Sequence, residues 1–97
     1  SEEEVVTSAL NIGELYYALL KDSDENTAEY WSQKFSLTAL NPRLDEIILA
    51  MKLRFENKEK RFSYIDCIGY ILAKKQNLVF LTGDQAFKEM PNVKFVK

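Results

Sequence analysis

The chain has 97 residues, of which 46% are apolar, and it carries 15 acidic and 13 basic side chains for a formal net charge of −2. This length and composition predict one soluble globular domain. The charge balance lacks the basic excess that usually drives nucleic-acid binding. A nuclease is not excluded, because a bound cation can reverse the sign of a local site.

The sequence contains no histidine and one cysteine, Cys67. Serine–histidine and cysteine–histidine catalysis are therefore excluded, as is a histidine-ligated zinc site. A single cysteine forms no internal disulfide, so we expect a reducing compartment and a cytoplasmic location. No apolar run is long enough to span a bilayer. Enzymatic chemistry would have to rest on carboxylates, lysines, hydroxyls or a metal.

Apolar periodicity predicts the elements of the first half of the chain. They are a short strand at 5–7, a helix at 9–21, a helix at 27–35, a short strand within 35–40, and a helix that starts at 41–42. The last start is predicted because Asn41 is a good N-cap and Pro42 suits the first helical position. Its apolar stripe runs from Leu44 to Phe55.

In the second half, Ser63 can cap a helix. The predicted elements are that helix at 64–76, a strand at 78–82, a short helix at 85–90 and a strand at 93–96. The strand at 78–82 is apolar enough to be buried on both faces. Strand, short helix and strand in succession predict parallel pairing and an α/β fold.

Three carboxylates lie near the predicted junctions of strands and helices. Asp84 directly follows a strand, and the crevice beyond the carboxyl ends of parallel strands is the usual binding site. Glu14 lies on the first helix, and Asp66 lies in the first turn of the helix after Ser63. Both of these have apolar chain neighbours, unlike the acids of the charged segment 56–61.

Each carboxylate also has a purely structural interpretation. Glu14 can face solvent or form a capping box with Asn11, and Asp66 stands at capping-box spacing from Ser63. Asp84 can serve as a turn or N-cap residue before the short helix. Sequence spacing does not place the three carboxylates together.

Other features favour structural roles. Cys67 is expected to be a small buried apolar residue, because no neighbouring base would activate it. The basic runs at 58–61 and 74–75 are typical of solvated helix ends, and either could also contact a phosphate backbone.

Three segments together resemble the PIN-domain family of metal-dependent nucleases, which includes the VapC-type toxins. The segment 5–15 is similar to a strand and a helix that bears a glutamate, and 62–68 is similar to a helix start that bears an aspartate. The segment 78–87 resembles the strand-Thr-x-Asp-x-x-Phe signature of the family. The order and spacing agree over essentially the whole chain.

The resemblance implies a Rossmann-like parallel sheet flanked by helices. It also implies that Glu14, Asp66 and Asp84 converge on Mg²⁺ or Mn²⁺, both as metal ligands and as catalytic residues. Thr82 and Asn11 would support that site. The residue types suit this chemistry, because hard divalent cations prefer carboxylate and water oxygens.

One part of the family pattern is absent from residues 1–97. The family begins with an apolar strand that ends in an aspartate, and that strand lies at the centre of the sheet. We therefore expect 1–97 to form a single PIN-like domain that is incomplete at its N-terminus. We expect its own strands to close the gap by re-pairing, or a partner chain to close it, as in a strand-exchanged dimer.

The resemblance implies a metal-dependent endoribonuclease of toxin type, incomplete or inactive as this chain. Its substrate would be RNA, and its partner a small antitoxin that covers the acidic groove. A second hypothesis is a non-catalytic PIN-like domain for binding or assembly. A third is an unrelated small α/β domain whose acids lie far apart.

Overall fold

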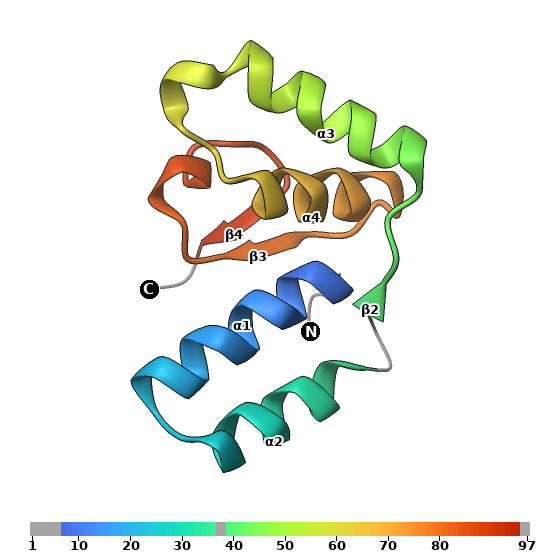
Figure 1. The fold of residues 1–97 in the computed structure, drawn as a ribbon. Helices are drawn as coiled ribbons and strands as arrows, with labels where there is room; N and C mark the ends of the chain where they lie inside the picture. Colours follow the sequence, from blue (N-terminus) through green and yellow to red (C-terminus); the bar gives the residue numbers. More distant parts are fainter. Residues whose placement is uncertain (1–6, 37–38, 96–97) are drawn as a thin grey trace.

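The computed structural model describes residues 7–36 and 39–95 (Figure 1). The elements in chain order are β1 (Thr7–Ser8), α1 (Ala9–Asp22), α2 (Glu25–Ser36), β2 (Ala39–Leu40), α3 (Leu44–Glu56), the 3₁₀ turn η1 (Lys58–Lys60), α4 (Tyr64–Lys75), β3 (Phe80–Thr82), the 3₁₀ turn η2 (Gln85–Phe87) and β4 (Val93–Phe95). Helices α1 and α2 lie side by side, and α3 packs along α4.

The order of the predicted helices and strands agrees with the structure, and their boundaries differ by a few residues; the strand predicted at 78–82, for example, begins at Phe80. Helix α3 begins at Leu44 with Arg43 as its N-cap, two residues later than Asn41-Pro42 predicts. The short helix at 85–90 is a single 3₁₀ turn that ends at Phe87. Most of the strand predicted at 5–7, together with residue 96, lies outside the described residues.

The described strands pair in parallel, as the α/β class predicts, but they form two separate sheets. Thr7 of β1 pairs with Ala39 of β2, and Phe80 of β3 pairs with Val93 of β4. The predicted unit of strand, short helix and strand is confirmed in β3, η2 and β4. Within residues 7–36 and 39–95, no strand joins β1 to β3.

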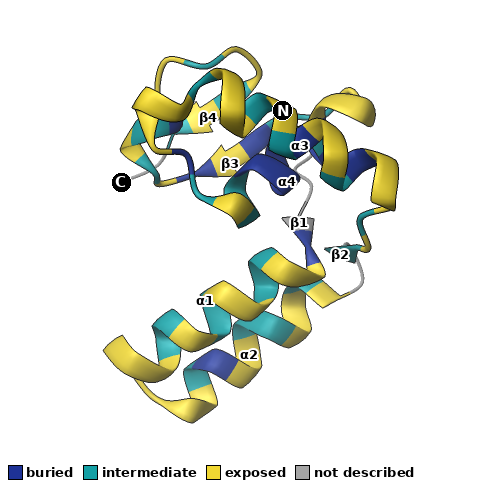
Figure 2. Cartoon of the chain, turned by 45° about the horizontal axis from the view of Figure 1, so that its top comes forward, coloured by how far each residue is buried: buried dark blue, intermediate teal, exposed yellow. Residues whose placement is uncertain are grey.

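The core lies between α4, β3 and the segments that flank them, and Figure 2 shows the buried colour concentrated on these elements. The rings of Phe62 and Phe87 stack with centroids 4.2 Å apart. Tyr70 is buried, and its hydroxyl donates a hydrogen bond to the Pro91 carbonyl at 2.7 Å. Burial of these rings supplies the main apolar stabilisation of this part of the chain. Cys67 is buried in the same cluster, as the sequence predicts.

One burial prediction is wrong, and the burial of α1 is low for its sequence. Strand β3 is buried on one face only, because Leu81 is 40% exposed between the buried Phe80 and Thr82. Helix α1 has no buried residue in spite of its broad apolar face. Leu10 and Leu20 are exposed even though α2 packs against α1.

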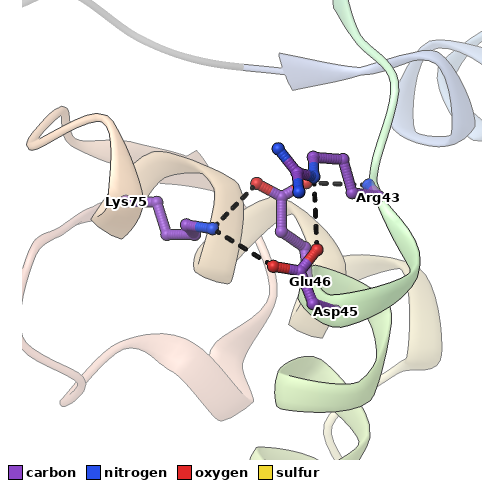
Figure 3. A network of polar contacts seen from close by, with 4 residues as sticks. All are labelled: Arg43, Asp45, Glu46 and Lys75. Carbon is purple, nitrogen blue, oxygen red and sulfur yellow. Dashed lines mark hydrogen bonds and ion pairs between the residues drawn. The ribbon is translucent and has the colours of Figure 1, made fainter.

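A polar network attaches the start of α3 to the end of α4 (Figure 3). Glu46 is buried, and its Oε1 accepts a hydrogen bond from the Arg43 backbone N–H at 2.8 Å. Its Oε2 lies 3.4 Å from Lys75 Nζ, which also lies 3.8 Å from Asp45 Oδ2. One glutamate therefore caps α3 and ties it to the last turn of α4.

Candidate functional site

Asp66 projects from the first turn of α4, where Ser63 is the N-cap. The Ser63 Oγ accepts a hydrogen bond from the Asp66 backbone N–H at 3.0 Å. The cap therefore uses the backbone of Asp66. Its carboxylate is half-buried and turns toward the end of β3.

Asp84 lies two residues beyond β3, and two local hydrogen bonds hold it in place. Its backbone N–H donates to Thr82 Oγ1 at 3.1 Å, and its Oδ1 accepts from the Ala86 N–H at 3.0 Å. Asp84 is thus the N-cap of η2, as the structural interpretation of the sequence predicted. Thr82 is buried and fixes the backbone of Asp84.

The carboxyl groups of Asp66 and Asp84 lie within hydrogen-bonding reach of each other. Burial, followed by the hydrogen bond to Asp84 and by the negative charge of Asp84, raises the pKa of Asp66 to about 6. Hydrogen bonding by Ser63 acts in the opposite direction, and the charge of Glu14 makes the smallest contribution. Two acids this close in a half-buried place carry repulsion that a proton or a cation would relieve.

Asn11 lies beside this pair. Its Nδ2 donates a long hydrogen bond of 3.5 Å to Asp66 Oδ1, while its Oδ1 accepts from the Ser8 hydroxyl at 2.7 Å. Ser8 is fully buried and is the N-cap of α1, so the capping box that the sequence allowed between Asn11 and Glu14 does not form. Asn11 supports Asp66, whereas the sequence interpretation had placed it near Glu14.

Glycine at position 69 allows this arrangement. A Cβ on Gly69 would stand 2.7 Å from the Phe80 ring and 2.8 Å from Asn11 Oδ1. Both distances are shorter than real Cβ contacts, so α4 reaches β3 and Asn11 only because residue 69 has no side chain.

Glu14 is exposed on α1, one turn beyond Asn11. It lines a shallow, mostly apolar hollow of about 640 Å³ between α1 and the start of α4, with Ile65 among the other lining residues. It acts on Asp66 through its charge alone. Within the part of the chain that the structure describes, no group of three or more acidic or cysteine side chains is close enough to hold a metal ion.

The donor set still suits one kind of metal binding. Mg²⁺ is commonly held by one or two carboxylates, with water and substrate phosphate oxygens completing its shell. The Asp66 and Asp84 pair supplies two carboxylates and an unrelieved negative charge. These two residues therefore fit an open site for a hard divalent cation, and they do not form a closed protein cage.

Comparison with family models matches residues 1–93 to the PIN domain. The chain belongs to the PIN-domain family. Neither the search of curated proteins nor the search of solved structures returned a significant match. PIN domains in general are nucleases that depend on divalent metals and bind RNA. Among the described residues, no helix has the length and apolar character needed to cross a membrane.

Sequence reasoning on this PIN domain missed the role of Ser8. The signal was a repeated spacing, because Ser8 stands three residues before Asn11 just as Ser63 stands three residues before Asp66. A serine N-cap bonds to the N–H of the third helical residue. The side chain of that third residue lies at the site in both helices.

The one cysteine of the PIN domain takes no part in this chemistry. Burial raises the pKa of the Cys67 thiol to about 11, although the charge of Arg54 acts in the opposite direction. A thiol that stays protonated is a poor nucleophile and a poor metal ligand.

Proposed function

We propose that this PIN domain carries part of the site of a metal-dependent endoribonuclease. The observation that carries the proposal is the contact between the carboxyl groups of Asp66 and Asp84. Asp66 comes from the first turn of α4 and Asp84 from just beyond β3. The rest of α4 and the whole of β3 separate them in sequence. Capping fixes the backbone of Asp66 and one carboxylate oxygen of Asp84, but it does not explain why the two carboxyl groups face each other.

Asp66 and Asp84 would hold Mg²⁺ or Mn²⁺, and Glu14 would join them if α1 shifts toward α4 or if a water molecule bridges the gap. When bound, such a cation supplies Lewis acidity for hydrolysis of a phosphodiester. The protein's own contribution is positional. Asn11 orients Asp66 through its amide, and Thr82 fixes Asp84 through the Asp84 backbone N–H.

The substrate in this proposal is RNA, and the domain is of the VapC toxin type. An antitoxin would then neutralise the site by placing a basic side chain against Asp66 and Asp84, because a lysine or arginine relieves the same repulsion as a metal. We further propose a cytoplasmic location, in keeping with a buried, protonated Cys67 that needs no oxidising environment.

We also propose that a further strand, one that carries another acid, completes the sheet between β1 and β3. One feature supports it: the described strands form two sheets that are not joined. An unpaired strand edge is a template for another strand. A second copy of the chain could supply that strand in a dimer, or polypeptide that precedes residue 1 could do so.

A second candidate function is a non-catalytic PIN-like domain for binding or assembly. One observation favours it: Glu14 is exposed, and no described group of three acids is close enough to hold a metal. In that case, Asp66 and Asp84 would not bind divalent cations, and such cations would not stabilise the protein.

Cleavage of RNA tests the catalytic proposal. We expect Mn²⁺-dependent cleavage of single-stranded RNA by the protein that includes the proposed further strand. Cleavage should be lost in Asp66→Asn and in Asp84→Asn. The control is Asp22→Asn, which removes one acid from the exposed end of α1. Equal cleavage by all four proteins would rule out a role for the pair.

Thermal unfolding separates the two candidates without needing activity. A ligand that binds only the native state raises the unfolding midpoint, so the metal-binding proposal predicts a higher Tm in Mn²⁺ than in EDTA. The shift should vanish in Asp84→Asn and persist in Asp22→Asn. An identical Tm with and without Mn²⁺ in the parent chain would favour the non-catalytic candidate.

A further inference from the structure

Helix α3 turns back toward α4 through the segment that contains η1 (Figure 1). A surface hollow lies at this turn. We call it the basic pocket. Its volume is about 460 Å³, and its lining residues are Met51, Arg54, Lys58, Arg61, Phe62 and Ser63. Three of these six residues are cationic and none is acidic. The rest form an apolar wall and the hydroxyl that caps α4.

The cations of the basic pocket lack carboxylate partners. Among residues 7–36 and 39–95, the ion pairs of the chain join other residues, and Arg54, Lys58 and Arg61 take part in none of them. The Arg54 Nε donates to the Phe62 carbonyl at 3.1 Å, and Lys58 Nζ lies 5.0 Å from the centroid of the exposed Phe55 ring. An exposed cation–π contact of this kind is weak. Most donors of the three side chains therefore remain available to an anion.

The backbone of this turn brings the cations together. Lys58 begins η1, and Arg61 is the C-cap of this turn, three residues later. The Arg61 N–H donates to the Lys58 carbonyl at 3.3 Å and closes the turn. Arg61 has a left-handed backbone with φ 58° and ψ 41°, which reverses the chain toward α4. A long cationic residue is an unusual choice for that conformation, since asparagine or glycine fits it better.

The basic pocket adjoins the carboxylate pair. Ser63 lines the pocket, and its Oγ also accepts the Asp66 N–H. Ser63 and Asp66 stand three residues apart, which is about 4.5 Å along a helix axis. The Cys67 thiol, next to Asp66 in the chain, lies within the electrostatic influence of Arg54 as well as of Asp66 and Asp84.

We propose that the basic pocket binds a backbone phosphate of single-stranded RNA while a neighbouring part of the same strand lies at Asp66 and Asp84. The proposal rests on the nuclease function proposed above and adds the place where the strand is held. Arginine and lysine donors are the usual partners of phosphate oxygens, and contacts of this kind position a strand without reading its sequence.

The size and lining of the pocket favour a strand over a free anion. A volume of about 460 Å³ is many times the roughly 30 Å³ that one water molecule occupies. It therefore leaves room for a sugar or base beside the phosphate. Met51, which is half-buried, offers those groups an apolar contact.

Fluorescence anisotropy of a labelled single-stranded oligoribonucleotide tests the proposal in EDTA, where no divalent cation supports cleavage. The variants are Lys58→Gln and Arg61→Asn, the second chosen because asparagine tolerates the left-handed backbone. Each should weaken binding about 3- to 10-fold near 0.1 M salt and should reduce the slope of log affinity against log salt by about 0.7. The matched control is Lys52→Gln on the same helix, α3, whose side chain is exposed and does not line the pocket.

Unchanged affinity and slope in both pocket variants, or equal losses in Lys52→Gln, would overturn the proposal. So would displacement of the oligonucleotide from the parent chain by millimolar inorganic phosphate at constant ionic strength, because that result would mark a site for free anions. The assay is independent of the nuclease proposal. If RNA binding depends on the pocket but the protein never cleaves RNA, the binding proposal is supported and the nuclease proposal is rejected.

Discussion

The carboxyl groups of Asp66 and Asp84 face each other at close range, although Asp66 lies in the first turn of α4 and Asp84 is the N-cap of η2. The Asp66 backbone N–H donates to the Ser63 cap, and the Asp84 Oδ1 accepts from the Ala86 N–H. Their mutual approach is therefore a property of how α4 packs on β3. It concentrates negative charge at a half-buried point, which is the arrangement that a divalent cation stabilises.

The pKa of Asp66 predicts how stability depends on pH in the absence of metal. The folded chain holds the Asp66 proton up to about pH 6, while the unfolded chain releases it near the ordinary value of 3.8. Between these values the folded state binds more protons, so the free energy of unfolding falls as pH rises. Relative to Asp66→Asn, the parent should lose about 1 kcal/mol between pH 4 and pH 7, after a reduction for partial solvent screening.

Urea unfolding in EDTA at both pH values measures that difference. Asp22→Asn serves as the control for removal of one negative charge at an exposed place. If the gap between the parent and Asp66→Asn stays constant from pH 4 to pH 7, then the folded structure does not perturb the Asp66 carboxyl.

Asn11 is expected to act on metal binding through Asp66. Asn11→Ala removes the amide that contacts Asp66 Oδ1 and the oxygen that accepts from Ser8. Loss of such an orienting group typically lowers metal affinity about 10-fold or more, and the lost hydrogen bonds should cost about 1 kcal/mol of stability. Isothermal titration with Mn²⁺ and urea unfolding measure the two effects.

Asn57→Ala is the matched control for Asn11. Asn57 donates one side-chain hydrogen bond to the Leu53 carbonyl at 2.9 Å, at the end of α3. Its replacement should cost comparable stability and leave Mn²⁺ affinity unchanged. A similar loss of Mn²⁺ affinity in both variants would mean that Asn11 acts only through general stability.

The order of elements was predictable from the sequence, whereas the extent of burial was not. Periodicity showed which residues of α1 share a face, but the coverage of Leu10 and Leu20 depends on elements elsewhere in space. Leu81 illustrates the same limit, because an apolar strand is buried on both faces only when something lies on each. The capping signal at Ser63 was reliable, since a cap involves only three or four consecutive residues, whereas α3 begins two residues after the cap predicted at Asn41.

The candidate site was predictable in part for the same reason. The motifs named Asp66 and Asp84, and the structure brings these two together. They did not show that Glu14 would be exposed, or that Asn11 would contact Asp66 across 55 residues of sequence. In the sequence, the basic pocket was visible only as a run of charged residues. Its cationic side chains come together because the left-handed backbone of Arg61 reverses the chain.

The polar network at the start of α3 is expected to stabilise mainly through its cap. Glu46→Ala removes a buried carboxylate that accepts the Arg43 N–H, and we expect a loss of about 1–2 kcal/mol. Lys75→Ala removes only a half-exposed cation, and a loss below about 1 kcal/mol is expected. Thermal unfolding in 0.1 M and 1 M NaCl separates the two, because salt should screen the Lys75 effect and leave most of the Glu46 effect. Larger destabilisation by Lys75→Ala would reverse this ranking.

The two helical glycines, Gly69 and Gly13, should respond to alanine with opposite signs. In Gly69→Ala, the new Cβ would meet the buried Phe80 ring at 2.7 Å and Asn11 Oδ1 at 2.8 Å, so α4 must move away from β3. Overpacking of this kind costs about 1–3 kcal/mol. In Gly13→Ala, the Cβ meets nothing within 4 Å, and removal of a glycine from a helix interior should gain up to about 1 kcal/mol.

Urea unfolding of both variants measures this contrast, and Mn²⁺ titration adds a readout at the site. Gly69→Ala displaces Asn11 and α4 together, so it should weaken Mn²⁺ binding as well as stability. Gly13→Ala should leave Mn²⁺ binding as it is, because α1 keeps its Ser8 cap and its Asn11 contact. A stable Gly69→Ala variant with full Mn²⁺ affinity would show that the close approach of α4 to β3 is not needed to form the carboxylate pair.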